Sequence, residues 1–182
     1  MFLSPGGRAA PRKNRSMVLL NTLIANNSAT LFDLNSFSKG FFQYEIVFNN
    51  ILAGTAGGQT LEIQVHSGNA FQTSSYLGSV LTIGNGTSGV TNVTTYIPVG
   101  QTGSVLSAGA GLSGSIRVSS PANTLAPKNW YGGVAMSYGG TVSNMGYSGG
   151  FWNGGNGALD GFQILLGTGN IASGIIKIYG IA

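Results

Sequence analysis

The chain has 182 residues with 31 glycines and no cysteine, and its eight Lys or Arg against four Asp or Glu give a net charge of +4. Without cysteine there are no disulfides, thiolate metal sites or cysteine nucleophiles. Only 7% of the residues are charged, against about 25% in an average globular protein. Such a surface has little charge to oppose association, so we expect copies of the chain or a larger assembly to cover much of it.

Residues that could perform acid–base catalysis are scarce. The acids are Asp33, Glu45, Glu62 and Asp160, and the only histidine is His66. Glu45 and Glu62 are expected on the polar faces of two strands that are predicted to pair, and two carboxylates flanking a groove are what glycoside hydrolysis requires. Like charges directly opposite are unfavourable, however, so we interpret both as solvated residues. We predict a protein that is not an enzyme and holds no cofactor or metal.

Residues 1–40 are predicted to form an extended arm and a docking segment. The arm carries four cations, Arg8, Arg12, Lys13 and Arg15, among prolines and glycines that oppose independent folding. We expect it to become ordered on assembly, against an acidic protein surface or nucleic acid. Residues 18–24 are interpreted as a first strand or a docking segment, and less readily as the apolar core of a secretory signal. The remaining charges balance, so the folded body is not expected to bind nucleic acid.

Residues 41–182 are predicted to form one β-sandwich domain. Apolar residues alternate with polar ones over 42–48 and again over 61–65, which is typical of half-buried strands. The glycines between these two strands predict that they form an antiparallel hairpin. Further strands are expected at 79–83, 91–99, 113–119, 130–138, 162–166 and 174–179. Short strands with turn signals between them, and no helical stripe, predict an all-β antiparallel sandwich of jelly-roll type.

The last expected strand is apolar on both faces. Ile176 and Ile178 share one face, while Ile175, Lys177 and Tyr179 share the other. We expect the second face to meet the opposite sheet, a loop or a neighbouring subunit. The alternative is a simple central strand of a monomer.

The segment DGFQILLGTGNIASGIIKIYGI, residues 160–181, resembles the closing segment of a broad group of tailed-bacteriophage virion proteins. The matching positions are Asp160, Phe162, Ile164, Gly169, Asn170, Ile171, Ser173, Gly174, Ile176, Ile178, Tyr179, Gly180 and Ile181. Segments 44–51, 61–76 and 116–123 are similar more loosely. The resemblance implies a jelly-roll module of a phage particle, often trimeric, that serves in tail fibres, tail tips or capsid decoration. It implies no catalytic residues.

One aromatic stretch is the best candidate for ligand contact. Tyr147, Phe151 and Trp152 lie among glycines, with Asn153 and Asn156 close by in the sequence. Aromatic rings can stack on sugar rings, and amide side chains can bind hydroxyls, so these five residues predict a loop that binds a glycan or a receptor. The alternative is that the aromatic residues seal one end of the sandwich or a trimer interface.

The predicted function is therefore that of a non-enzymatic virion structural protein of the tail-associated fibre or adhesion type. The expected partners are two further copies in a homotrimer, other virion proteins contacted by the arm, and a host surface glycan, with no membrane contact. A capsid decoration (cement) protein is the first alternative. A carbohydrate-binding lectin or a glycan-cleaving enzyme with the same sandwich is the second.

Overall fold

The computed structural model describes residues 16–55, 59–84, 87–100, 111–138, 142–155 and 157–182. Apart from one 3₁₀ helix, η1 (Ser36–Lys39), the regular elements of this part of the chain are strands. They are β1 (Met17–Ser28), β2 (Thr30–Asp33), β3 (Gln43–Ala53), β4 (Leu61–Ser67), β5 (Ala70–Phe71), β6 (Tyr76–Gly84), β7 (Thr87–Val93), β8 (Ile97–Val99), β9 (Leu112–Ser119), β10 (Lys128–Tyr138), β11 (Val142–Trp152), β12 (Gly161–Leu166) and β13 (Ile171–Ile181).

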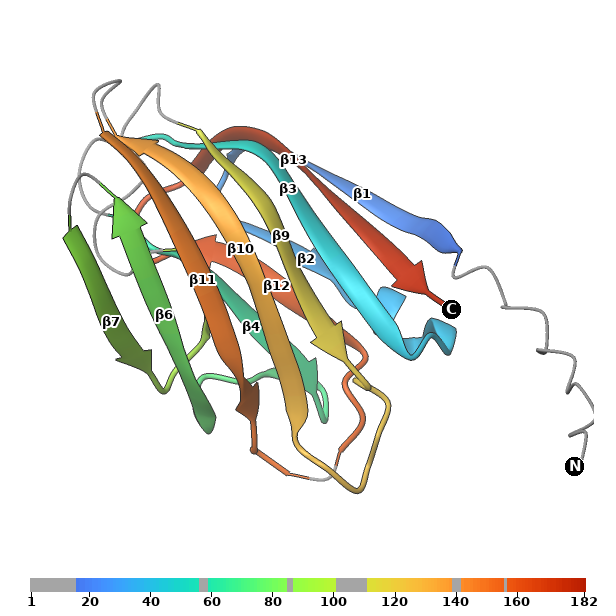
Figure 1. Ribbon diagram of the computed structural model, residues 1–182. Helices are drawn as coiled ribbons and strands as arrows, with labels where there is room; N and C mark the ends of the chain where they lie inside the picture. Colours follow the sequence, from blue (N-terminus) through green and yellow to red (C-terminus); the bar gives the residue numbers. More distant parts are fainter. Residues whose placement is uncertain (1–15, 56–58, 85–86, 101–110, 139–141, 156) are drawn as a thin grey trace, which may run out of the picture.

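The strands form two antiparallel sheets that pack face to face (Figure 1). The larger sheet has eight strands in the order β1-β13-β3-β9-β10-β11-β6-β7. The smaller sheet has the order β2-β12-β4-β5, and β8 also pairs with β4. The larger sheet is the broader layer in Figure 1, with β2, β12 and β4 behind it.

Eight of the strands pair as nested antiparallel partners. β1 pairs with β13, β2 with β12, β3 with β9, and β4 with β8. A long hairpin rolled up into two sheets gives this nesting, which is the connectivity of a jelly roll. Two insertions, β6–β7 and β10–β11, extend the larger sheet beyond the roll. The predicted all-β antiparallel sandwich of jelly-roll type is confirmed.

The core lies between the sheets. It consists of apolar side chains, which alternate along each strand with polar ones and point inward. From the larger sheet, Tyr44, Ile46, Phe48, Ile116, Val118, Ile176 and Ile178 are fully buried, and from the smaller sheet Leu61, Ile63, Val65, Phe162 and Ile164. Each such side chain contributes about 1.5–3 kcal/mol relative to remaining exposed. The buried Tyr44 hydroxyl donates to the Phe37 carbonyl at 2.9 Å, so its polar atom is also satisfied.

The predicted hairpin between residues 42–48 and 61–65 is wrong. β3 belongs to the larger sheet, where it pairs with β13 and β9, and β4 belongs to the smaller sheet, where it pairs with β12, β5 and β8. The glycine-containing link between them therefore crosses from one layer to the other. Both strands have one apolar row, and in opposite layers these rows can face each other across the core.

Two further strand predictions need correction. The single strand expected at 91–99 is two strands, because β7 ends at Val93 in the larger sheet and β8 starts at Ile97 in the smaller one. The stretch expected to be a ligand-binding loop is β11 up to Trp152. The glycines of β11 leave room for neighbouring side chains to pack closely against the backbone of the strand.

The sheets begin at Met17. β1 pairs with β13 over its length, and its Ala25 is buried, so the segment interpreted as a first strand or a docking segment is a strand. β2 and η1 follow it within the region assigned to the arm. The predicted docking cations Arg8, Arg12, Lys13 and Arg15 lie outside the described residues. β13 itself lies between β1 and β3, with Ile176 and Ile178 buried inward and Ile175 exposed on the outer face.

Candidate functional site

The part of the larger sheet built by the two insertions has an apolar outer face. Strand pairing brings six side chains together there, each between 39% and 67% exposed. We call this set the outer patch: Leu77, Leu81, Ile83, Val90, Met145 and Tyr147. Contiguous exposed apolar surface of this kind marks contact with another molecule.

The sequence of β11 explains why its large residues point outward. Trp130 on β10 is buried, and its ring covers the inner side of β11 and β6. A Cβ added at Gly78 would lie 2.5 Å from Cζ2 of Trp130, and one added at Gly150 would lie 2.8 Å from the same atom. The inward positions of these strands must therefore be small beneath this ring, and the bulky residues of β11 alternate to the outer face.

The outer patch is corrugated in rows that cross the strands. One row runs through Tyr147, Leu81 and Val90. The next row, about 7 Å along the strands, has small side chains at Gly149 and Ser79 and continues to Asn92 on β7.

An open hollow of about 540 Å³ lies over this second row. It is lined by Leu77, Gly78, Ser79, Asn92, Val93, Thr94, Gly149, Gly150 and Phe151. Within it the Ser79 hydroxyl donates to the Asn92 side-chain oxygen at 2.8 Å, so these two polar groups satisfy each other. The lining that remains is largely backbone and apolar carbon.

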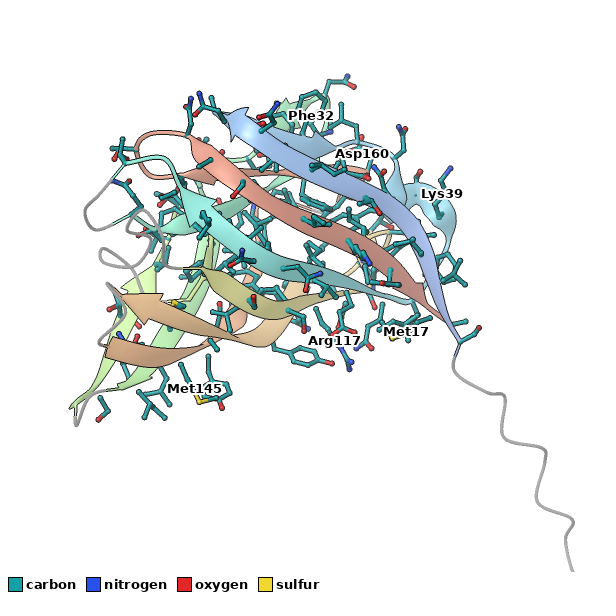
Figure 2. All side chains as sticks on the ribbon, turned by 90° about the horizontal axis from the view of Figure 1, so that it is seen from above. Met17, Phe32, Lys39, Arg117, Met145 and Asp160 are labelled. Carbon is teal, nitrogen blue, oxygen red and sulfur yellow. The ribbon has the colours of Figure 1, made fainter. Side chains whose placement is uncertain are left out.

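The outer patch differs in polarity from the rest of the outer surface, since the larger sheet carries Glu45 and Arg117 on its outer face beyond the patch. The four strands of the two insertions, β6, β7, β10 and β11, contain one charged residue, Lys128, which is buried. The smaller sheet instead carries Glu62, His66 and Gln163 on its outer face. Figure 2 shows Met145 and Phe32 on opposite sides of the molecule, which mark the two outer faces. The outer patch is therefore suited to an apolar partner.

The predicted glycan-binding residues do not form one surface. Tyr147 is 46% exposed in the outer patch, and Phe151 is half-buried at the edge of the hollow. Trp152 is 2% exposed, and its indole N–H donates to the Ser74 carbonyl at 3.1 Å, so its ring packs in the core. Asn153 is exposed just after β11, and Asn156 lies outside the described residues.

Most acidic side chains take part in structural contacts. The Asp33 carboxylate is buried and accepts hydrogen bonds from Asn21 and Ser36. Glu45 pairs with Arg117 at 3.1 Å between Oε2 and a guanidinium nitrogen. Glu62 lies on the other sheet, where burial raises its pKa, so Glu45 and Glu62 do not flank a common groove.

The sequence did not reveal one pair, His66 and Asp160. Nδ1 of His66 lies 2.5 Å from Oδ1 of Asp160, where β4 approaches the start of β12. The His66 ring also packs edge-on against Phe71, with centroids 5.0 Å apart. Among the described residues, no three His, Asp or Glu side chains gather into a possible metal site. The pair is 94 residues apart in the chain, so only the fold brings it together.

Lys128 is a second feature that only the structure reveals. It is 1% exposed, and its ammonium nitrogen has no hydrogen-bond partner in the described part of the chain. The nitrogen lies 5.9 Å from the centroid of the Trp152 ring, within range of a cation–π interaction. Burial lowers the pKa of Lys128.

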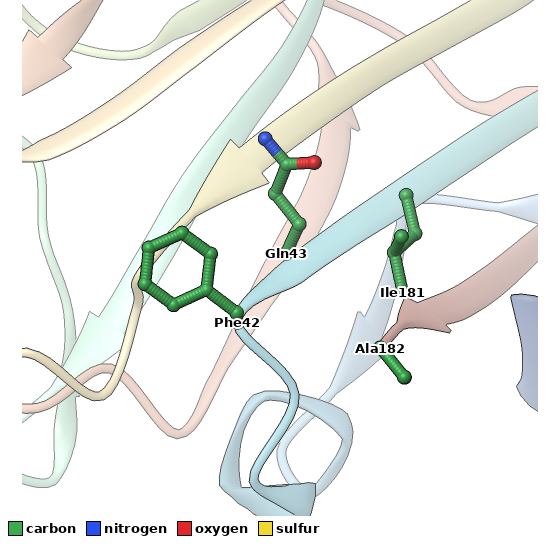
Figure 3. Close-up of a pocket in the computed structure, with 4 residues that line it drawn as sticks. All are labelled: Phe42, Gln43, Ile181 and Ala182. Carbon is green, nitrogen blue, oxygen red and sulfur yellow. The ribbon is translucent and has the colours of Figure 1, made fainter. Parts of the chain in front are cut away.

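A smaller hollow of about 310 Å³ lies where β3 begins beside the end of β13. Figure 3 shows its lining residues Phe42, Gln43, Ile181 and Ala182. Phe42 is 73% exposed, while the Gln43 amide donates to Ser119 Oγ at 3.1 Å. The backbone N–H of Ala182 donates to the Ser16 carbonyl at 3.3 Å, so the chain enters β1 at this end of the sandwich.

Comparison with known protein families, with curated proteins and with solved structures gives no match. None of the helices in the described ranges has the length and apolar character needed to cross a membrane. Function is therefore inferred from the fold, from the outer patch and from the resemblance of the closing segment.

Proposed function

We propose that the protein is a non-enzymatic structural subunit of a bacteriophage virion. The observation that carries the proposal is the uncharged, apolar outer patch on a jelly-roll sandwich, because contiguous exposed apolar surface marks contact with another molecule. The resemblance of residues 160–181 to phage virion proteins points to the same class. That segment forms β12 and β13, so its alternating residues supply core side chains.

The proposed subunit joins the particle through two regions. Its sandwich contacts further copies, for which the resemblance implies a trimer, and its basic arm contacts other virion proteins. The described part of the chain starts at Ser16, at the end of the sandwich that also holds Ala182. The four arm cations would therefore act at this end, away from the outer patch.

We propose a tail-associated position, with Tyr147 and Phe151 as the aromatic residues available to a host glycan. Capsid decoration is a second candidate, and a specific observation favours it. Ser79 and Asn92 bind each other within the hollow, and Trp152 is buried, so the patch presents few free hydrogen-bonding groups for sugar hydroxyls. An apolar face of this kind suits protein contact better.

Particles of the phage that encodes the chain test this function directly. We expect mass spectrometry of gradient-purified particles to detect the protein at a fixed copy number, and immunogold labelling to place it on the tail. Labelling of the head instead would support the capsid decoration role. Recovery of the protein only in the unassembled soluble fraction would contradict a structural role.

The lectin and enzyme alternatives have a separate test. A lectin would bind glycans of a host surface extract and lose that binding in Tyr147→Ala, whereas an enzyme would release sugar products and lose turnover in Glu62→Gln. Under the proposed function, the free chain releases no sugar products, and the Glu62→Gln variant is incorporated into particles as well as the wild type. Product release by the wild type would contradict the non-enzymatic assignment.

A further inference from the structure

We propose that Phe2 and Leu3 dock beside the exposed Phe42 ring of the same chain, so that residues 4–15 close into a basic loop held at both ends. Residues 1–15 lie outside the described residues, and the structure supplies the surface and the attachment point. The inference goes beyond the proposed function, because the contact forms within a free subunit. It commits to one occupant, the apolar part of this chain's own arm.

The turn before β3 holds Phe42 outward. The preceding residue, Phe41, packs inward: a Cβ added at Gly180 would lie 2.4 Å from its ring, and the ring meets Tyr44 edge-on with centroids 6.0 Å apart. Phe42 is 73% exposed, although its carbonyl oxygen accepts a hydrogen bond from the Ser120 N–H at 2.8 Å. The exposed ring therefore stands on a fixed backbone, as a preformed contact surface requires.

Two hollows flank the Phe42 ring. The hollow of about 310 Å³ is lined by Phe42, Gln43, Ile181 and Ala182 (Figure 3). The second, of about 230 Å³, is lined by Gly40, Phe41, Phe42, Ser120, Ala122 and Asn123. None of these lining residues is charged, and apolar atoms make up most of both linings. The surface therefore suits apolar side chains and offers no charged partner to the cations of the arm.

The attachment point of the arm favours this occupant. The carbonyl of Ser16 accepts a hydrogen bond from the Ala182 N–H at 3.3 Å, and Ala182 lines the first hollow. β13 lies between β1 and β3, and the register brings the first residues of both strands to the same level. Ser16 and Phe42 are thus separated by two strand spacings, roughly 10 Å. Residues 4–15 reach about 40 Å when extended, so the arm is long enough to turn back.

The composition of the arm fits the same surface. Within residues 1–15 the large apolar side chains are those of Met1, Phe2 and Leu3, and the remaining residues are Pro, Gly, Ala or polar. A short flexible tether gives the attached segment an effective concentration in the millimolar range, far above that of another copy in dilute solution. Docking leaves the four arm cations in a loop at this end, which lowers the ordering cost of their contact with other virion proteins.

The chain has no cysteine, so introduced cysteines can test the contact in the full-length protein. Ser4→Cys places a thiol next to the docking residues and leaves both unchanged. Its partners are Ala182→Cys in the first hollow and, as an independent pair, Ala122→Cys in the second. Leu19→Cys is the matched control, since Leu19 is 51% exposed on β1 and lies within about 10 Å of Ser16, where a free arm reaches it as readily. Alkylation rates of the single variants correct for differences in thiol reactivity, and circular dichroism checks the fold.

Under oxidised glutathione we expect both hollow pairs to form disulfides about 10-fold faster than the control pair, within single chains of 18.6 kDa. Adding Phe2→Ser and Leu3→Ser to the same chains should reduce these rates to that of the control. Equal rates for hollow and control pairs, fast rates that survive the two replacements, or disulfide-linked pairs of chains as the main product would overturn the inference. These outcomes leave the virion role intact, because incorporation into particles tests that role separately.

Discussion

Two adjacent glycines of β11 face opposite environments. The side of Gly149 is open, whereas a Cβ at Gly150 would lie 2.5 Å from the Gly78 Cα and 2.8 Å from the Trp130 ring. The sequence shows both as one Gly-Gly dipeptide and cannot separate their roles. Strand pairing with β6 and the position of Trp130 decide which glycine the core requires.

We expect Gly150→Ala to lower the free energy of unfolding by about 1–3 kcal/mol, because the added methyl group overpacks the contact between β11, β6 and Trp130. Gly149→Ala is the matched control and should change stability by no more than about 0.5 kcal/mol. Urea unfolding followed by tryptophan fluorescence measures both. Equal effects at the two positions would contradict the placement of Trp130.

The buried Lys128 ammonium should reduce stability, because burial removes water from a charge that gains only the contact with Trp152. We expect Lys128→Met to raise the free energy of unfolding at pH 7 by about 1 kcal/mol. Chemical denaturation of both proteins measures the difference. A less stable Met variant would show that the ammonium makes a net favourable contact.

The same residue gives a pH dependence. The pKa of Lys128 is lowered by burial in the folded chain and has its ordinary value of 10.5 in the unfolded chain. Between these two values the unfolded state binds more protons, so the wild type gains stability as pH rises. The advantage of Lys128→Met should therefore shrink as the pH is raised toward 10.5, and a constant difference would argue against the lowered pKa of Lys128 in the fold.

At the scale of elements, Asp33 connects β1, β2 and η1. Its carboxylate accepts hydrogen bonds from the Asn21 amide at 2.6 Å, from the backbone of Asn35 at 3.0 Å, and from the Ser36 backbone and hydroxyl at 2.7 and 2.8 Å. Burial by itself would raise the pKa of Asp33, but these hydrogen bonds outweigh it and hold the pKa below 3.8. The charged form therefore stabilises the start of the sandwich.

We expect Asp33→Asn to lower the free energy of unfolding by about 1–3 kcal/mol at pH 7, because a buried acceptor of several hydrogen bonds loses its charge. The stabilisation by the charged Asp33 carboxylate is fully present above pH 3.8, the pKa of this group in the unfolded chain. It is lost as the pH falls through the lower pKa of the folded chain. Urea titrations from pH 2 to pH 7 should show the two proteins converging only below pH 3.8. Convergence already at pH 5 would contradict the lowered pKa.

The elements also show what the sequence can predict. Alternation located β3, β4, β6, β9, β10, β12 and β13 because each has one apolar row for the core. It failed for β11, whose inward residues are small and whose outward residues are large, so the pattern resembles a loop rich in glycine. It also could not assign strands to layers, since an apolar row fits either sheet, and β3 and β4 were wrongly paired for this reason.

At the scale of the whole molecule, low charge predicts that copies of the chain or an assembly cover much of the surface, which stays a prediction, and it does not indicate where an apolar surface lies. The outer patch draws residues from three strands, β6, β7 and β11, that are separated in the chain. Of the predicted site residues, Tyr147 belongs to the patch and Phe151 borders its hollow, whereas Trp152 completes the core. Aromatic composition indicates a packing surface, but only the register shows which side of the sheet a ring occupies.

Methionine oxidation of the associated protein tests most directly that other protein covers the outer patch. Met145 and Met17 have matched exposure, 46% and 49%, on the patch and on β1, and Met136 is a buried reference at 3%. We expect dilute peroxide, with peptide mass spectrometry, to oxidise Met145 and Met17 at similar rates in dilute monomer. At concentrations where the chain associates, Met145 should become as slow as Met136 while Met17 stays fast. Oxidation of Met145 at an undiminished rate in the associated protein would contradict the account.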